Sequence, residues 1–314
     1  MDLDSKIYVA GHRGMVGSSI LRRLQHLGFT NIITKTKSEL DLTNQLSVSE
    51  FFNHHKPEYV FLAAAKVGGI KANNDNKADF IYQNLMIQTN VIKASFDCQV
   101  KKLLFLGSSC IYPKMSPQPI KEEYLLTGEL ETTNDAYSIA KISGIKMCQS
   151  FNQQFGTNYI SAMPTNLYGF NDNYDLQNSH VIPALIRKFH EAKVSGQSSV
   201  EIWGTGTPMR EFLYVDDLAD ACVYLMNNYN DSEIVNVGTG KDITIKELAY
   251  LVKDVVGFSG DIYFNSNNPD GTPRKLLDVS KLEGLGWKHK TSLREGLEKT
   301  YLDYMNIIDG IKMV

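Results

Sequence analysis

Cysteine is scarce in this chain. Only four of its 314 residues are cysteines, namely Cys98, Cys110, Cys148 and Cys222. They lie far apart, with no Cys-x-x-Cys pair and no spacing typical of a metal site. We therefore expect reduced thiols, a cytoplasmic location and no bound metal.

Long apolar runs and basic runs are also missing. No segment approaches the roughly 18 apolar residues that a membrane span needs. Residues 1–10 combine an acidic start with an apolar run of only strand length, unlike a signal peptide. Lys and Arg are scattered, and the formal net charge is −3. These absences argue against a membrane or a nucleic acid as partner, whereas a small anionic ligand remains compatible.

The first half of the chain alternates between short apolar segments and amphipathic ones. We expect strands at 6–10, 31–34, 59–63, 102–106 and 159–163, and helices at 15–27, 47–54, 80–96 and 137–155. This alternation predicts an α/β fold built on a Rossmann-type, doubly wound parallel sheet. The strands are apolar throughout because both faces of such a sheet are covered.

The alternation becomes less regular after Pro164. We expect helices near 182–193, 217–226, 245–256 and 293–305, and one more strand at 233–237. We interpret residues 1–170 as the Rossmann domain and 171–314 as mainly a smaller α/β substrate-binding region. Segments near 205–240 are expected to return to the sheet.

A glycine-rich segment follows the first expected strand directly. It reads Gly11, His12, Arg13, Gly14, Met15, Val16, Gly17. Glycines here allow a tight turn and a close backbone approach to a pyrophosphate, and the N-terminus of the following helix favours an anion. The pattern predicts a dinucleotide site; an ordinary strand-to-helix turn is the alternative.

Cations stand where NAD-binding sites usually place a carboxylate, at the end of the second expected strand. Lys35 and Lys37 lie there, and Arg13 lies in the glycine-rich turn. Cations attract a 2′-phosphate, so the sequence favours NADP(H) and makes 1–170 an NADP-binding domain; lysines that merely solvate a loop are the alternative. Residues 41–43 follow, where we expect contact with adenine.

A set of Ser, Tyr and Lys suits hydride transfer to a carbonyl. Tyr137 and Lys141 lie one helical turn apart, and Ser108 or Ser109 follows the expected strand at 102–106. We expect the Lys141 ammonium to lower the pKa of the Tyr137 phenol, so that the phenol protonates an alkoxide while a serine hydroxyl bonds the same oxygen. Chance alone would produce about one Tyr-x-x-x-Lys in such a chain, so an exposed helical pair is the alternative.

A thiol and an imidazole suit proton transfer beside a carbonyl. Cys110 is two residues beyond Ser108 and should enter the same site, and His180 precedes the expected helix at 182–193. Together they form a base and an acid for opposite faces of a sugar ring, and a neighbouring imidazolium would favour the thiolate. Taken singly, Cys110 also fits a buried core position, and His180 a helix cap.

Several segments in order give the chain a resemblance to a known family. They are GHRGMVG at 11–17, AAAKVGGI at 63–70, GSSCIYP at 107–113, MPTNLYG at 163–169, NSH at 178–180, WGTGTPMREF at 203–212 and PDGTPRK at 269–275. On these segments the chain closely resembles the extended short-chain dehydrogenase/reductase family, nearly from end to end, and within it the enzymes that make GDP-L-fucose.

The resemblance implies a bifunctional, NADP-dependent epimerase and oxidoreductase. Such an enzyme epimerises GDP-4-keto-6-deoxy-D-mannose at C3 and C5, then reduces C4 with NADPH to give GDP-L-fucose, in de novo GDP-fucose biosynthesis. By matching motif, Ser108, Tyr137 and Lys141 would serve reduction. Cys110 and His180 would serve epimerisation.

The resemblance also implies which residues hold the ligands. Those expected to bind the cofactor are Gly11, His12, Arg13, Gly14, Met15, Val16, Gly17, Lys37, Asp41, Leu42, Ala63, Ala65, Leu106, Lys141, Pro164, Asn166, Leu167 and His180. Those expected to bind the nucleotide sugar are Lys188, Trp203, Arg210, Asp270 and Lys275.

Two of these substrate residues have simple structural alternatives. Trp203 would pack on guanine, or else in a core. Arg210 would clamp the diphosphate, or else form a surface ion pair with Glu211. The family also implies a homodimer through the helices expected at 80–96 and 137–155.

Two other functions remain possible from the sequence. One is a nucleotide-sugar 4-epimerase that keeps its NAD bound and consumes no cofactor; Cys110, His180 and Lys35 argue against it. The other is an NADP-binding regulator without catalysis, which the intact Ser, Tyr and Lys set disfavours.

Overall fold

The computed structural model describes residues 1–176, 179–267 and 270–310. Asn178 and Pro269, which belong to two of the motifs above, lie outside these described residues. Within the described ranges, no helix combines the length and the hydropathy that a bilayer span requires.

The centre of the molecule is a six-stranded parallel sheet with the order β2-β1-β3-β4-β5-β9. The strand bounds are β1 Ile7–Ala10, β2 Ile32–Ile33, β3 Tyr59–Leu62, β4 Lys102–Leu106, β5 Tyr159–Pro164 and β9 Val235–Val237. The chain moves from β1 to β2 on one side and then to β3 on the other. The predicted α/β fold with a doubly wound, Rossmann-type sheet is therefore confirmed.

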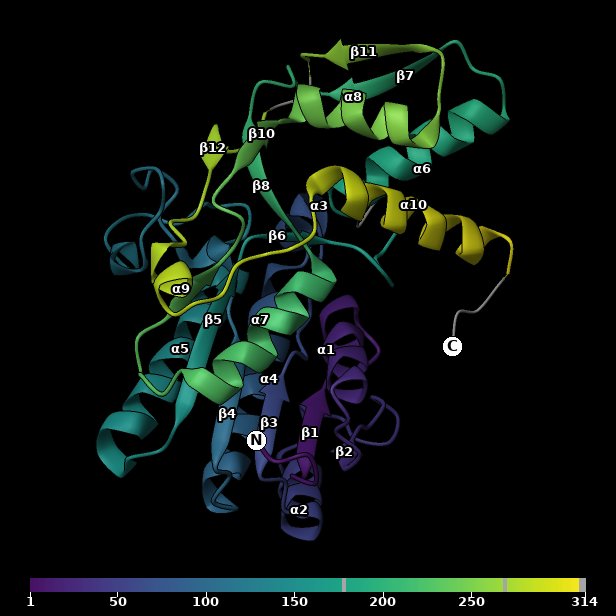
Figure 1. Cartoon of the computed structure of the whole chain (residues 1–314). Coiled ribbons are helices and arrows are strands. Elements are labelled where there is room, and N and C mark those ends of the chain that lie inside the picture. The colour runs from purple at the N-terminus through teal and green to yellow at the C-terminus, as the bar shows by residue number, and fades with distance from the viewer. Residues whose placement is uncertain (177–178, 268–269, 311–314) are drawn as a thin grey trace.

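Helices cover both faces of this sheet (Figure 1). α1 and α7 pack against each other over one face, and α2, α4 and α5 cover the other. The bounds are α1 Met15–His26, α2 Gln45–His55, α4 Lys77–Asp97, α5 Asp135–Phe155 and α7 Val215–Asn228, with shorter α3 Ile70–Asp75 and the 3₁₀ turns η1 Ser109–Ile111 and η2 Glu122–Tyr124. The helices expected at 80–96 and 137–155 are thus α4 and α5.

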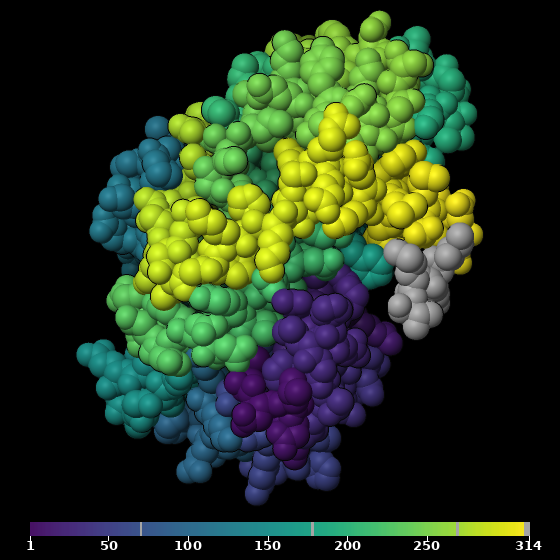
Figure 2. All heavy atoms as spheres, in the orientation of Figure 1, coloured from purple at the N-terminus to yellow at the C-terminus, as the bar shows by residue number. Residues whose placement is uncertain are grey.

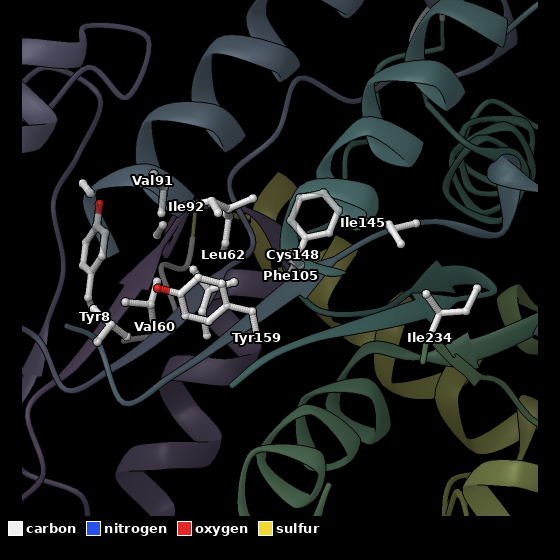
Figure 3. Close-up of a cluster of buried hydrophobic side chains, with 14 of the residues drawn as sticks. Tyr8, Val60, Leu62, Val91, Ile92, Phe105, Ile145, Cys148, Tyr159 and Ile234 are labelled. Carbon is white, nitrogen blue, oxygen red and sulfur yellow. The ribbon is translucent and has the colours of Figure 1, made fainter. Parts of the chain in front are cut away.

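The apolar strands bury both of their faces, as a sheet between two helix layers requires. Along β1, Ile7 and Val9 join the core shared with α1 and α7, whereas Tyr8 and Ala10 join the core shared with α2, α4 and α5. Figure 3 shows the second of these cores, in which Phe105 of β4 lies close to the side chains of α5.

Within the described residues, the smaller region is built from shorter strands and three helices, whereas a fourth, α9, packs on β9 of the central sheet. β8 pairs with β10, β12 and β6, and β7 pairs with β11. The bounds are β6 Asn166–Tyr168, β7 Ser199–Trp203, β8 Met209–Tyr214, β10 Asp242–Thr244, β11 Asp261–Asn265, β12 Arg274–Lys275, α6 Val181–Val194, α8 Ile245–Val256, α9 Ser280–Gly284 and α10 Leu293–Ile308. α6, α8, β8 and α10 share a third core.

The chain returns to the central sheet after the smaller region has begun. α7 packs on α1, and β9 pairs with β5. β8 belongs to the smaller region, and the chain returns to the central sheet from Val215 onward. Figure 2 shows the green and yellow C-terminal segments over the upper part of this face and the purple N-terminal segments below them.

One glycine sets how closely α5 approaches the sheet. A methyl group on Gly144 would collide with the ring of Phe105, whereas one on Gly284 would meet nothing within 4 Å. Overpacking costs about 1–3 kcal/mol, and alanine recovers only about 1 kcal/mol of helix propensity. We expect Gly144→Ala to lower the free energy of unfolding by about 1 kcal/mol in urea titrations, and Gly284→Ala to leave it unchanged or raise it. Equal stability of the two variants would contradict this packing.

Candidate functional site

A cavity of about 1320 Å³ lies along the carboxyl ends of the central strands. Loops after β1, β3, β4 and β5 line it from one side, and the smaller region lines it from the other. All of the residues predicted to be catalytic border it, namely Ser108, Cys110, Tyr137, Lys141 and His180. The cavity therefore brings both predicted chemistries to one place.

The glycine-rich turn forms one end of the cavity. Gly11 has a φ of +89°, and a methyl group on Gly17 would collide with the carbonyl of Gly11, so the turn admits no larger residue at either position. Gly14 is the N-cap residue of α1 and provides no side-chain cap. The helix N-terminus thus faces the cavity with its backbone N–H groups available to an anion.

A smaller pocket of about 340 Å³ adjoins this end and is lined by cations. Arg13, Lys35 and Lys37 border it, and Lys35 also pairs with Glu39 at 3.8 Å. The buried Nδ1 atom of His12 has no hydrogen-bond partner. Three cations against one carboxylate leave the pocket positive, and an unsatisfied buried nitrogen is a further sign of a polar ligand. The residues present therefore fit a dinucleotide with an additional phosphate.

The other expected cofactor residues border the large cavity as well. They are Gly11, Gly14, Met15, Val16, Gly17, Lys37, Asp41, Leu42, Ala63, Ala65, Leu106, Lys141, Pro164, Asn166, Leu167 and His180. His12 and Arg13 border only the smaller pocket.

Ser108, Tyr137 and Lys141 converge from β4 and α5. Ser108 follows the end of β4, and its Oγ accepts from the backbone N–H of Cys110 at 3.2 Å. Lys141 is buried, and its Nζ donates to the carbonyl of Leu106 at 2.7 Å while lying 5.8 Å from the centre of the Tyr137 ring. The helical spacing of Tyr137 and Lys141 thus aims both side chains at the strand end.

The expected effect of Lys141 on Tyr137 is wrong. Burial raises the pKa of Tyr137, the nearby Cys110 raises it further, and a hydrogen bond with Ser108 only partly opposes these effects. Burial also lowers the pKa of Lys141 to about 7, so the amine is only partly charged at neutral pH. The phenol therefore keeps its proton, which is the form that can donate to an alkoxide.

Cys110 lies among hydrogen-bond donors. Its Sγ is 3.4 Å from Nζ of Lys275 and 3.5 Å from Nδ2 of Asn134. Burial alone would raise the pKa of the Cys110 thiol, but Lys275, Ser108 and Arg210 together bring it below its usual value. A thiolate is thus favoured, and its cation is Lys275 rather than the expected imidazolium.

His180 occupies the N-cap position of α6, yet its side chain caps no backbone group. The side chain faces the cavity. The protein around the cavity shields it from bulk water, and this desolvation lowers the pKa of the imidazole. The imidazole is therefore neutral at pH 7, which removes it as the source of positive charge for Cys110. The helix-capping alternative for its side chain is wrong.

The residues expected to hold the nucleotide sugar lie at the far end of the cavity, with one exception. Trp203, Arg210, Asp270 and Lys275 border it. Lys188 does not, but its Nζ lies 5.7 Å from the centre of the Trp203 ring and donates to the Glu201 carbonyl at 3.2 Å. Lys188 thus extends the Trp203 surface.

The alternatives for Trp203 and Arg210 are both wrong. Trp203 is 66% exposed, which excludes core packing. Glu211 is fully buried and accepts from the backbone N–H groups of Thr239, Gly240 and Leu277 at 2.6, 2.8 and 3.0 Å. Its carboxylate is therefore engaged elsewhere, and Arg210 turns to the cavity.

Sequence reasoning missed some residues of the site. Asn134, directly before α5, reaches Cys110, and Lys66, Lys71, Lys114, Glu131 and Thr133 also border the cavity. Asn134 lies three residues before Tyr137, and this proximity was the one available signal. Lys66 lies within the segment AAAKVGGI and Lys71 lies in α3, whereas Lys114, Glu131 and Thr133 lie in loops without a motif.

A sequence profile of the NAD dependent epimerase/dehydratase family matches residues 7–238. GDP-L-fucose synthase 1 of Arabidopsis thaliana is 62% identical over 304 residues, which cover 97% of this chain and 94% of the relative. Both similarities span most of the chain, although the profile ends before the cavity residues Asp270 and Lys275.

Solved structures of two other proteins are also similar to this chain over nearly its whole length. MlghC, a GDP-mannoheptose C4 reductase from Campylobacter jejuni with NADP bound, is 47% identical, with a TM-score of 0.91 and coverage of 97% of this chain and 99% of that one. A GDP-L-fucose synthetase from Naegleria fowleri bound to NADP is 25% identical, with a TM-score of 0.92 and coverage of 99% and 98%.

Proposed function

Because the chain belongs to the NAD dependent epimerase/dehydratase family, we propose that it epimerises GDP-4-keto-6-deoxy-D-mannose at C3 and C5 and then reduces C4 with NADPH. The product is GDP-L-fucose, and the reaction belongs to de novo GDP-fucose biosynthesis. The observation that carries the proposal is the shared cavity, in which Cys110 and His180 accompany Ser108, Tyr137 and Lys141. A simple reductase has no need of the first pair.

Epimerisation uses the acidity of the carbons beside the C4 carbonyl. One of Cys110 and His180 removes the proton from such a carbon, and the other returns a proton to its opposite face. The hydroxyls of Ser108 and Tyr137 donate to the C4 oxygen while it carries the enolate charge. The same oxygen site serves C3 and C5, since both are neighbours of C4.

Reduction uses the same oxygen site. When bound, NADPH would supply the hydride for C4. Tyr137, whose raised pKa keeps it protonated, gives its proton to the developing alkoxide, and Ser108 holds that oxygen in place. Lys141, anchored on the Leu106 carbonyl, orients the phenol from the next turn of α5.

We propose NADP(H) as the cofactor and the nucleotide sugar as the small-molecule partner. Arg13, Lys35 and Lys37 support a 2′-phosphate contact. Trp203 offers an exposed aromatic face to guanine, with Lys188 beside it, and Arg210 offers a bidentate donor to the diphosphate.

We also propose a cytoplasmic homodimer joined through α4 and α5, with no nucleic acid or membrane partner. Both helices leave large apolar side chains exposed, including Tyr82 at 62% on α4, and Ile139 at 46% and Phe155 at 49% on α5. Such surface is costly to leave in water, and a second copy would cover it.

Turnover with the substrate tests the function directly. Incubation with NADPH and GDP-4-keto-6-deoxy-D-mannose should consume NADPH steadily, and NMR of the sugar should show inversion at C3 and C5. A product reduced at C4 without inversion would indicate a reductase alone. Turnover without net use of NADPH would indicate a 4-epimerase, and tight NADPH binding without turnover would indicate a regulator.

Because different residues serve epimerisation and reduction, substitutions at Cys110 and at Tyr137 should impair different steps. Cys110→Ser should slow epimerisation by about 10²–10⁴-fold, because a general acid or base contributes that much, and should retain C4 reduction of the unepimerised sugar. Tyr137→Phe should instead slow reduction by a similar factor. It should retain exchange of the C3 and C5 protons in D₂O at a reduced rate, because Ser108 still donates to the enolate oxygen. NMR of the products measures both. The same product profile from the two variants would overturn the assignment.

The cation pocket predicts a change of cofactor preference. Lys37→Ala should weaken NADPH binding by about 10- to 150-fold, since a charge-assisted hydrogen bond is worth about 1.5–3 kcal/mol, and should leave NADH binding unchanged. Fluorescence titration with the two cofactors measures this. Lys288→Ala, which removes an exposed cation outside both pockets, serves as the matched control. Equal losses for NADPH and NADH would show that Lys37 does not contact the 2′-phosphate.

A further inference from the structure

The surroundings of the Cys110 sulfur favour a negative charge. Two nitrogen donors lie close to Sγ, Nζ of Lys275 at 3.4 Å and Nδ2 of Asn134 at 3.5 Å. An ammonium and an amide NH₂ only donate hydrogen bonds, so neither can accept a proton from the thiol. Both contacts strengthen when the sulfur is ionised.

The ammonium group of Lys275 is available to this sulfur because it forms no ion pair with a carboxylate of the described residues. Among the described residues, no Asp or Glu oxygen lies within 4.0 Å of its Nζ. The two acidic groups of the cavity nearby are engaged elsewhere: Asp270 accepts from Thr205 at 2.7 and 2.9 Å, and Glu131 pairs with Lys114 at 2.9 Å.

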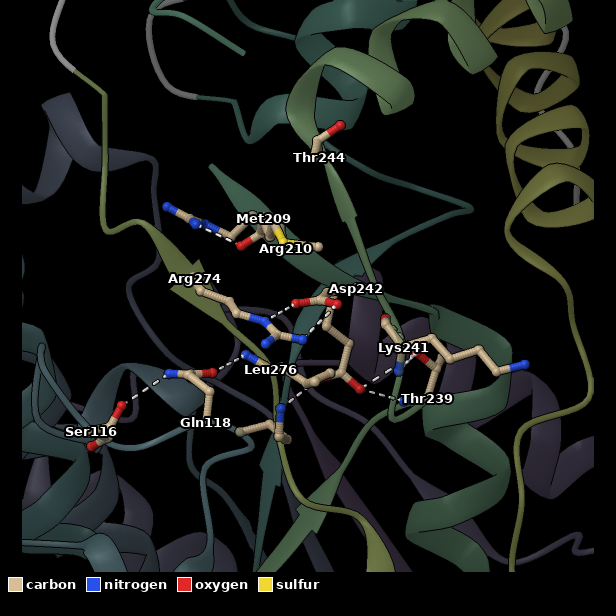
Figure 4. A network of polar contacts seen from close by, with 12 residues as sticks. Ser116, Gln118, Met209, Arg210, Thr239, Lys241, Asp242, Thr244, Arg274 and Leu276 are labelled. Atoms are coloured by element: carbon tan, nitrogen blue, oxygen red, sulfur yellow. Dashed lines mark hydrogen bonds and ion pairs between the residues drawn. The ribbon is translucent and has the colours of Figure 1, made fainter. Parts of the chain in front are cut away.

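The backbone that carries Lys275 is clamped on both sides. In the backbone pairing of β12 with β8, Lys275 lies opposite Arg210. On one side Nε of Arg274 donates to Asp242 at 2.5 Å. On the other the backbone N–H of Leu276 donates to Gln118 at 2.8 Å, as Figure 4 shows. The position of Lys275 is thus set before any ligand binds.

A buried carboxylate completes the clamp. Glu211 follows Arg210 on β8, and its Oε2 accepts from the backbone N–H of Leu277 at 3.0 Å. Its Oε1 accepts from Thr239 and Gly240. Glu211 therefore joins the strand that carries Lys275 to two other segments.

We propose that Lys275 is the counter-ion of a resting Cys110 thiolate and so sets the charge with which Cys110 enters the epimerisation. The role in epimerisation rests on the proposed function, whereas the ion pair itself does not. The resemblance implied a substrate contact for Lys275, and the geometry assigns it to the sulfur.

The charged and titratable groups around Cys110 agree with this assignment. Burial opposes ionisation, Lys275 and Arg210 favour it, and the pKa of the thiol ends below its usual value. Tyr137 remains protonated beside it, and His180 and Lys141 border the same cavity. Lys275 supplies both a charge and a hydrogen bond, whereas Arg210 supplies charge alone.

The proton transfer balances without any further reagent. The thiolate takes the proton from the carbon beside C4, and an S–H bond replaces the C–H bond. The electron pair of the C–H bond moves into the enolate, so the negative charge passes from sulfur to the C4 oxygen. The thiol then passes this proton to the neutral imidazole of His180. The imidazolium returns the proton to the opposite face of the carbon, which restores the thiolate and the neutral imidazole.

Alkylation of Cys110 tests the ion pair without any substrate. Iodoacetamide is uncharged and reacts with the thiolate, so its rate against pH reports the thiol pKa. Mass spectrometry separates the Cys110 peptide from that of Cys98, whose pKa burial raises and which serves as internal reference. Cys110 of the wild type should react with a midpoint below the ordinary value of about 8.5.

Removal of the cation should raise this midpoint by about one unit, which corresponds to a tenfold slower reaction at pH 7. Lys275→Met tests this, Lys275→Arg should preserve most of the reactivity, and Lys241→Met removes an exposed cation of the same region as matched control. An ordinary midpoint in the wild type, or an unchanged one in Lys275→Met, would overturn the proposal. If Lys275→Met does not fold, the wild-type and Lys275→Arg profiles decide. A low midpoint without sugar turnover would refute the proposed substrate and leave the ion pair intact.

Discussion

Parallel pairing of the central strands is the constraint on which the site depends. β1, β3, β4 and β5 run in the same direction, so their carboxyl ends meet at one edge of the sheet. The glycine-rich turn after β1 and the serine and cysteine turn after β4 therefore face the same cavity. A reversed β4 would carry Ser108 and Cys110 to the opposite edge.

Withdrawal from water then sets the charge of each group in the cavity. It raises the pKa of Tyr137 and lowers that of Lys141 to about 7, so the phenol stays protonated. It would also raise the pKa of the Cys110 thiol, but Lys275, 3.4 Å from the sulfur, together with Ser108 and Arg210 brings that pKa below its usual value. One cavity thus raises the pKa of the phenol and lowers that of the thiol, because the ammonium group of Lys275 lies beside the sulfur.

Local patterns predicted much of the fold and part of the site. The alternation of segments indicated the doubly wound sheet, because burial on both faces leaves a continuous apolar run. The spacing of Tyr137 and Lys141 indicated a shared helix face, and the structure places both at the end of β4. Asn134 and the contact between Lys275 and Cys110 were missed, since 165 residues separate that lysine from the cysteine and no local period connects them.

The amino-acid order by itself determined the elements, the glycine turn and the identity of the reactive side chains. These follow from backbone sterics and from periodicities of a few residues, which any segment carries within itself. Only the tertiary structure decided which cation meets the thiol, that Glu211 turns away from Arg210, and that burial rather than Lys141 governs the phenol. Those outcomes depend on desolvation and on distances between segments far apart in the sequence, which exist only once the segments have packed together; the pairing of β12 with β8 is the one that places Lys275.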